Sequence, residues 1–230
     1  MDSILPLGPF RLIDAIALGF TLLAWFGIGW LIEHPPASRP SVCEIMKEYR
    51  REWMRQFITR QPRIFDASMI DNLRQGTAFF ASASMIAIGG GVALIGNPAA
   101  VIGIARDLTL PEQSVGFQAR VLLVVMFLAN ALLKFIWAHR LFGYCAIVMS
   151  AVPNELDHPM VNIRAQQAAE INITAAKSFN RGLHSIYFAL GSIAWLLGSY
   201  ALIVAIVLTS GVLLRREFAS KSREVILRNV

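Results

Sequence analysis

The chain carries little charge for its length. Only 16% of its 230 residues are charged and 56% are apolar, whereas roughly 25% of the residues of a soluble domain are charged. The charged residues are crowded between long stretches that carry none. Hydrocarbon offers the backbone no hydrogen bonds, so a long uncharged stretch is typical of a helix that crosses a membrane. The sequence therefore predicts an integral membrane protein.

Cysteine, metal-ligand clusters and catalytic motifs are also scarce. Cys43 and Cys145 are far apart and neither belongs to a CxxC pair, which argues against a disulfide framework and a structural zinc. His158, in the sequence ELDHP, lacks a second cluster of ligands, so a turn before a helix explains it better than a metal site. No HExxH, GxSxG or phosphate-loop motif occurs. We expect no cofactor and no metal, and the sequence leans against an enzyme.

The net charge of +6 comes from basic residues that flank the apolar stretches. This arrangement fits membrane lipids with anionic headgroups as partners. The sequence has no zinc-finger or RNA-binding signature, and no basic arm with interleaved aromatic residues. We therefore expect no nucleic-acid partner.

Four apolar stretches have about the length of a membrane crossing, which is roughly 20 residues. They cover residues 12–32, 76–96, 117–137 and 186–214. The limits of the third stretch are open, because the uncharged run between Arg120 and Lys134 is too short and the span must include at least one of these cations. The predicted fold class is all-α: a single membrane domain over residues 1–230, built as a bundle of about four transmembrane helices.

Two polar segments between the spans are also predicted to be helical, at residues 41–58 and 160–180. In the first, apolar residues recur every three or four positions and charged residues occupy the opposite face, which is typical of an amphipathic helix. Two placements remain open for it. The helix lies on the membrane surface, or it is a cytosolic helix packed on the bundle.

Small residues at helical spacing predict close helix contacts in two spans. In the second span, Ala83, Ala87 and Gly91 fall at successive i, i+4 positions. In the fourth span the small residues alternate three and four positions apart: Gly191, Ala194, Gly198, Ala201 and Ala205. Small residues let helix backbones approach closely, either within one chain or between chains.

The distribution of positive charge predicts the orientation. Residues 33–75 and 138–185 hold eight and four Lys or Arg residues, and the positive-inside rule places both segments in the cytoplasm. The basic tail from Arg215 to Arg228 conflicts with this arrangement. Four spans would leave its five cations on the outer side.

Polar residues near the end of the third span form the predicted polar site. Asn130 lies one turn before Lys134, and His139 and Arg140 follow. If the span includes them, these residues lie within the membrane, where ionisable groups are costly and usually functional. If the span ends near Trp137, Lys134 instead extends its ammonium group to the interface.

Three further residues flank the same side of the membrane in this topology: Arg74, Asn180 and Arg181. We hypothesise that they converge with the polar residues of the third span into one site. The alternative is that all of them anchor the bundle at the interface. Asp14, three residues after Arg11, is explained as a local ion pair or a helix-start carboxylate.

Three stretches of the sequence resemble a known family. They are RIFDASMIDNLRQGTAFFASASMIAIGGG (63–91), KFIWAHRLFGYCAIVMSAVPN (134–154) and AAKSFNRGLHSIYFALGSIAWLLG (175–198). Together they resemble a family of bacterial inner-membrane proteins with plant relatives, known only as a domain of unknown function. The resemblance covers nearly the whole chain and implies a multi-pass protein of the bacterial inner membrane. It implies no activity and no catalytic residues.

Three functions follow as hypotheses. We favour a non-enzymatic assembly or accessory protein, as a homo-oligomer or within a larger membrane complex, because small-residue seams join helices. The alternative is a small transporter or channel that uses Lys134 and Asn130. A membrane-embedded enzyme that acts on lipids ranks last, since no paired acid–base or metal motif is present.

Overall fold

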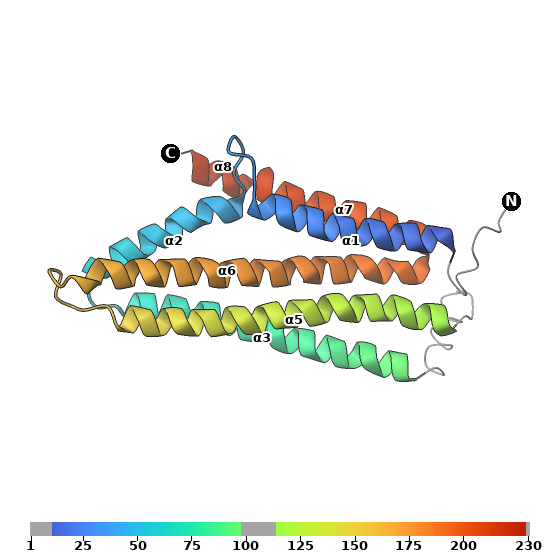
Figure 1. Cartoon of the computed structure of the whole chain (residues 1–230), viewed down its shortest axis with the longest axis horizontal. Helices are drawn as coiled ribbons and strands as arrows, with labels where there is room; N and C mark the ends of the chain where they lie inside the picture. Colours follow the sequence, from blue (N-terminus) through green and yellow to red (C-terminus); the bar gives the residue numbers. More distant parts are fainter. Residues whose placement is uncertain (1–10, 98–113, 229–230) are drawn as a thin grey trace.

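The computed structural model describes residues 11–97 and 114–228, and within them the chain is all α-helical (Figure 1). This confirms the predicted fold class. The helices are α1 (Leu12–Glu33), α2 (Val42–Thr59), α3 (Ile64–Gly96), α5 (Ser114–Ser150), α6 (Met160–Ile193), the short 3-10 helix η1 (Ala194–Leu197), α7 (Ser199–Phe218) and α8 (Lys221–Leu227).

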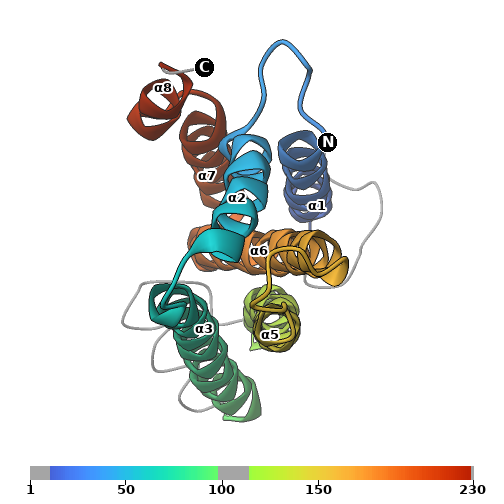
Figure 2. The ribbon, with the colours of Figure 1, turned by 90° about the vertical axis from the view of Figure 1, so that its left-hand side faces the viewer.

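The bundle is elongated, and α6 lies between a layer of α1, α2 and α7 and a layer of α3 and α5 (Figures 1 and 2). Helices α3, α5 and α6 have 33, 37 and 34 residues. At 1.5 Å per residue each is about 50 Å long, which exceeds the roughly 30 Å of a bilayer's hydrocarbon core. They run the whole length of the molecule, whereas α1 and α7 accompany them over one half and α2 over the other (Figure 1).

These two halves differ in composition. We call residues 12–33, 76–96, 116–137 and 182–214 the apolar half, and residues 42–75 and 138–181 the polar half. Three helices of the described chain are long and apolar enough to cross a membrane: α1, α3 and residues Gly116–Ser150 of α5. The predicted spans 12–32, 76–96 and 117–137 lie inside these three helices. The helices indicate a membrane protein.

The fourth predicted span, 186–214, is wrong as a single helix. Helix α6 ends at Ile193, η1 follows, and α7 begins at Ser199 after a reversal of the chain direction. Gly198 makes the reversal with a φ of 123°, a backbone conformation that side chains other than glycine rarely adopt. The apolar half therefore contains segments of five helices, α1, α3, α5, α6 and α7, instead of four.

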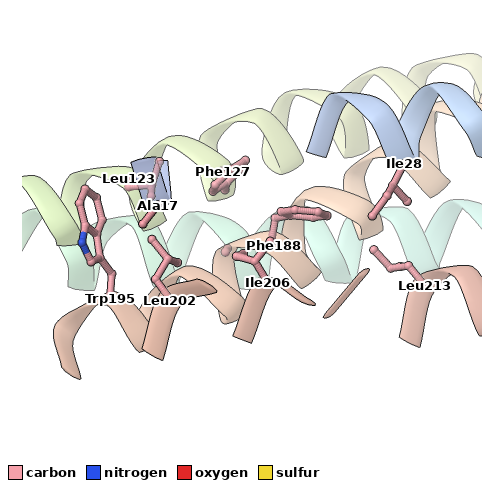
Figure 3. Close-up of a cluster of buried hydrophobic side chains, with 10 residues drawn as sticks. Ala17, Ile28, Leu123, Phe127, Phe188, Trp195, Leu202, Ile206 and Leu213 are labelled. Atoms are coloured by element: carbon pink, nitrogen blue, oxygen red, sulfur yellow. The ribbon is translucent and has the colours of Figure 1, made fainter. Parts of the chain in front are cut away.

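The core of the apolar half lies between α1, α5, α6 and α7 (Figure 3). Phe188 of α6 and Leu202 and Ile206 of α7 are fully buried at its centre. Trp195 of η1 closes the end next to the chain reversal. Because η1 contributes to the core, the reversal is a packed part of the fold.

A second core lies in the polar half, where α2 packs on the bundle. Met54 and Phe57 of α2 are 1% and 2% exposed, against residues of α3, α5 and α6 that include Ile70, Cys145 and Val161. The helix begins at Ser41, whose hydroxyl accepts a hydrogen bond from the amide of Glu44 at 3.2 Å. Helix α2 therefore packs on the bundle through its apolar face.

Only some of the predicted small-residue contacts form. A Cβ added to Gly91 would lie 2.5 Å from Val125 Cγ2 of α5, and one added to Gly191 would lie 2.9 Å from Thr209 Oγ1 of α7. Both glycines therefore bring helices of the same chain together. Ala83 and Ala87 instead face outward. The seam over the fourth span is also wrong as predicted, since Gly191 lies on α6, Ala194 on η1, Gly198 at the turn, and Ala201 and Ala205 on α7.

A buried carboxylate fixes the reversal to α1. Asp14 is 5% exposed, and its Oδ1 accepts hydrogen bonds from Trp195 Nε1 at 3.0 Å and from Ser199 Oγ at 2.5 Å. Its Oδ2 accepts from the amide of Arg11 at 3.0 Å. Asp14 therefore has the predicted role at the start of the helix. It also binds Trp195 and Ser199, which are distant in sequence and which the local pattern did not indicate.

Candidate functional site

A cavity of about 470 Å³ lies where α1, α2, α6, α7 and the start of α8 meet. It spans the junction of the two halves. Gly29, His184, Tyr187 and Leu213 line it from the apolar half, and the first two turns of α2 line it from the polar half. One end is thus mainly apolar, whereas the other carries charged side chains.

Glu33 is one of the three carboxylates that line the cavity. It ends α1 and its side chain is 16% exposed. Lys177 Nζ lies 3.0 Å from Glu33 Oε2, and Arg181 donates to the same oxygen at 2.6 Å. One carboxylate therefore serves two cations of α6.

Arg50 of α2 has a different kind of partner. Its Nη1 donates to the side-chain oxygen of Asn172, a neutral amide that is fully buried. Among the described residues, no carboxylate forms an ion pair with Arg50. Burial lowers the pKa of Arg50 from its ordinary value, as desolvation without a compensating carboxylate does. The cavity therefore contains a cation that has no carboxylate partner within residues 11–97 and 114–228.

The wall formed by α2 and α7 contains a cysteine and a buried glutamate. Glu217, 5% exposed, accepts a hydrogen bond from the amide of Cys43 at 3.2 Å. Asn180 Nδ2 lies 3.2 Å from Cys43 Sγ. Burial, and next the charge of Glu217, raise the pKa of Cys43 to about 12. The thiol is therefore protonated near neutral pH, which disfavours both nucleophilic attack and metal ligation.

Metal binding has no support from the geometry. Within residues 11–97 and 114–228, no three His, Cys, Asp or Glu side chains are grouped so that they could hold a metal ion. The chemistry that the cavity offers is charge pairing and hydrogen bonding at one end and apolar contact at the other.

Comparison with known proteins identifies a family. A family model described as "Protein of unknown function, DUF599" matches residues 16–222. The chain belongs to the DUF599 family. The match extends from α1 into α8, so it includes every helix that lines the cavity. No curated protein and no solved structure matches the chain.

Two of the seven predicted site residues of this DUF599 chain lie in the cavity, Asn180 and Arg181. Arg74 and His139 lie together elsewhere, at the contact of α3 and α5. His139 Nδ1 is 3.3 Å from the carbonyl oxygen of Arg74 and 3.2 Å from Thr77 Oγ1.

The other three predicted residues are separate. Asn130 donates to Ser185 Oγ at 2.7 Å, and Arg140 donates to the Tyr144 hydroxyl at 2.8 Å. Lys134 is half-buried, with no hydrogen bond or ion pair to another residue that the structure describes. The seven residues therefore do not converge on one site.

Aromatic side chains fill the space between α3, α5 and α6. The ring centroids of Phe80, Phe135 and Phe179 lie 5.4 to 5.6 Å apart. A Cβ added to Gly182 would lie 2.5 Å from Phe135 Cε1, so α6 approaches this cluster as closely as a residue without a side chain allows. The region beside Lys134 is packed.

Three residues of the cavity were not among the predicted site residues: Glu33, Arg50 and Glu217. Arg50 left a signal, because it stands four residues after Met46 and four before Met54. It is therefore a cation on the apolar side of α2. Glu33 and Glu217 left none, since the contact of α1, α2 and α7 at the cavity follows from the chain reversal at Gly198.

Proposed function

We propose that this DUF599 protein is a non-enzymatic accessory protein that crosses a bacterial inner membrane five times and binds an amphiphilic ligand in the cavity. The observation that carries the proposal is the cavity's position. It lies at the junction of an apolar and a polar half, with an apolar wall on one side and a charged wall on the other. An amphiphile in a bilayer likewise has its apolar part in the hydrocarbon and its polar group at the edge.

Five crossings are supported by the length of each segment. Residues 76–96 and 116–137 of α3 and α5 cover about 30 Å, and α1 has 22 residues. Residues 182–197 and 199–214 contain no Asp, Glu, Lys or Arg and cover about 24 Å each. These two segments are slightly shorter than the roughly 17 to 25 residues that usually span a bilayer, and local thinning of the bilayer would accommodate them.

The level of the charged residues supports the same membrane position. Each crossing has a charged residue at its polar-half end: Glu33, Arg74, Arg140, Arg181 and Arg215. Asp14 and Arg120 lie near the opposite end, where Arg120 Nη2 is 3.9 Å from Asp14 Oδ1. The hydrocarbon would lie between these two levels.

Five crossings also remove the conflict over the basic tail. The C-terminal helix α8 follows α7 at the polar-half end, so the five cations of residues 215–228 join the eight of residues 33–75 and the four of residues 138–185. The positive-inside rule then favours a cytoplasmic polar half that includes the C-terminus.

The competing functions have less support. A transporter that uses Lys134 and Asn130 has less support because Phe135, next to Lys134, packs against Phe80 and Phe179, and Asn130 donates to Ser185. Gly91 and Gly191 pack against helices of the same chain, so they no longer argue for a homo-oligomer. An enzyme would need an acid–base pair, and the cysteine in the cavity is protonated.

The proposal is tested by blocking the cavity. Ala176 of α6 lines it, whereas Thr174, two residues earlier, is exposed and does not. We expect the full chain in dodecyl maltoside to retain a bound lipid in native mass spectrometry, Ala176→Trp to lose it, and the control Thr174→Trp to keep it.

A second blocking variant, Met46→Trp, enters the cavity from α2 and covers the case in which Ala176→Trp fails to fold. Circular dichroism and size-exclusion chromatography report folding. Equal lipid retention by the wild type and by a folded, blocked variant would contradict the proposal.

A further inference from the structure

We infer that the cavity binds a phosphate group and that Arg50 is the residue that holds it. The inference rests on the proposed function and adds the chemical class of the ligand. A lipid headgroup and a soluble phosphate share this chemistry, and the apolar wall of Tyr187 and Leu213 favours the lipid.

The charge balance of the cavity favours an anion. Five cationic side chains and three carboxylates line it. Lys47 pairs with Glu44 on the same helix, and Glu33 is shared by Lys177 and Arg181. Positive charge thus exceeds negative charge in a partly desolvated space, where an uncompensated charge is costly and an incoming anion is attracted strongly.

Of the two excess positive charges, one is shared by Lys177 and Arg181 around Glu33, and the other is on Arg50. Arg216 is 3.9 Å from Glu217 and also donates to the Tyr187 hydroxyl at 3.0 Å. Arg50 has no carboxylate partner among the described residues and lines the cavity. It is therefore the cation with the most to gain from an anionic ligand.

The guanidinium of Arg50 is also held in position. Its Nη1 is bonded to the buried Asn172, and the Asn172 side chain in turn contacts Cys145 Sγ at 3.7 Å. A guanidinium has five N–H donors in a planar fork that matches two phosphate oxygens. With one donor used on the protein, the fork is oriented and enough donors remain for a bidentate contact.

The depth of the cavity matches a headgroup. Arg50 lies on α2, on the polar side of the junction, whereas Gly29 and Leu213 lie within the apolar half. In the five-crossing arrangement the phosphates of the cytoplasmic leaflet lie at this level. A lipid phosphate at Arg50 would leave its acyl chains at the apolar end.

The test compares three lipids of equal chain length with the full chain in dodecyl maltoside: phosphatidic acid, phosphatidylcholine and diacylglycerol. We expect phosphatidic acid to bind at least about tenfold more tightly than diacylglycerol, which has no phosphate, and phosphatidylcholine, whose phosphate is neutralised by its own choline, to bind between the two. Arg50→Gln should weaken phosphatidic acid binding about tenfold and leave diacylglycerol binding unchanged.

Arg51→Gln is the matched control. It makes the same chemical change one residue along α2, at a side chain that pairs with Glu48 and Glu170 outside the cavity. We expect its affinity for phosphatidic acid to stay within about twofold of the wild type. Lys177→Gln serves as a second cavity variant, because Arg181 remains on Glu33, and we expect about a threefold loss.

The possible results separate the two proposals. If all three lipids bind equally and Arg50→Gln behaves like Arg51→Gln, the phosphate inference is overturned while amphiphile binding stands. If no lipid binds, both fail. Inorganic phosphate that binds as tightly as phosphatidic acid would overturn the lipid source and keep Arg50 as a phosphate ligand.

Discussion

The apolar and polar halves are built from the same three long helices, yet their outer surfaces differ. In the apolar half large aliphatic side chains face outward, such as Leu23 at 75% and Ile86 at 76% exposed. In the polar half outward positions of α2 carry charged residues such as Glu48 and Arg55. The interiors are alike, with phenylalanine and small residues buried in both. The two halves are thus packed in the same way, and they differ in the polarity of their outward-facing side chains.

The polar contacts differ in the same way. The polar half has ion pairs along the surface of α2, between Lys47 and Glu44, Arg51 and Glu48, and Arg55 and Glu52. In the apolar half the polar contacts are fewer and buried, such as those of Asp14 with Trp195 and Ser199 and that of Asn130 with Ser185. Where no water is available, polar groups must form their hydrogen bonds with other groups of the protein.

Two buried aspartates sharpen this comparison and give the largest expected effect. Each accepts a hydrogen bond from an indole: Asp14 from Trp195 at 3.0 Å, and Asp66 of the polar half from Trp53 at 2.7 Å. We expect Asp14→Ala to lower the free energy of unfolding by about 4 kcal/mol, because the donors that it leaves lie in a dry environment.

Asp66→Ala should cost only about 2 kcal/mol, because its second partner, Arg60, is 36% exposed and can be hydrated once the carboxylate is removed. Thermal and chemical unfolding in detergent, followed by circular dichroism, measures both. A larger loss for Asp66→Ala than for Asp14→Ala would break the comparison.

Glycines that face inward and outward give the next largest effect. Gly182→Ala places a methyl group 2.5 Å from Phe135 Cε1, whereas nothing lies within 4 Å of a Cβ added to Gly90. We expect Gly182→Ala to cost about 2 kcal/mol through overpacking. Gly90→Ala should be neutral within about 0.5 kcal/mol. Equal unfolding midpoints for the two variants would mean that α6 does not approach α5 as closely as described.

Surface charge in the polar half gives the smallest effect. Arg51 is half-exposed and pairs with both Glu48 and Glu170, which links α2 to α6. We expect Arg51→Gln to cost about 0.5 kcal/mol at low salt and less in 0.5 M sodium chloride, because exposed pairs are screened. The same unfolding measurement at two salt concentrations checks this, and a loss that does not depend on salt would point to packing instead of charge.

Apolar composition predicted the helices but not the turn. Residues 186–214 read as one span because they contain no Asp, Glu or Lys before Leu214 and no proline. The reversal depends on the positive φ of Gly198 and on the packing of Trp195, neither of which alters hydropathy. Of the small residues predicted to form one seam, Gly191 instead packs against Ile206 and Thr209 of α7, on the other side of the turn.

The cavity could not be predicted from the sequence, because it also depends on the chain reversal at Gly198. Glu33, Arg50 and Arg181 are on three helices, and their meeting requires the fifth helix to lie beside α1. Asn180 and Arg181 were predicted because they lie in a stretch that resembles the family and flank the end of an apolar run. Arg50 was missed although its spacing from Met46 and Met54 places a cation on the apolar side of α2. That it has no carboxylate partner among the described residues is seen only in the packed structure.

The claim on which the rest depends is that the polar half and the C-terminal tail share one side of the membrane. Single cysteines at exposed positions test it in a background with Cys43→Ala and Cys145→Ala. We would place them as Tyr49→Cys in α2, Lys221→Cys in α8 and Asn97→Cys after α3, and label them with a membrane-impermeant maleimide in right-side-out and inside-out vesicles. The account predicts labelling of positions 49 and 221 from the cytoplasmic side and of position 97 from the other side, whereas labelling of position 221 together with position 97 would contradict it.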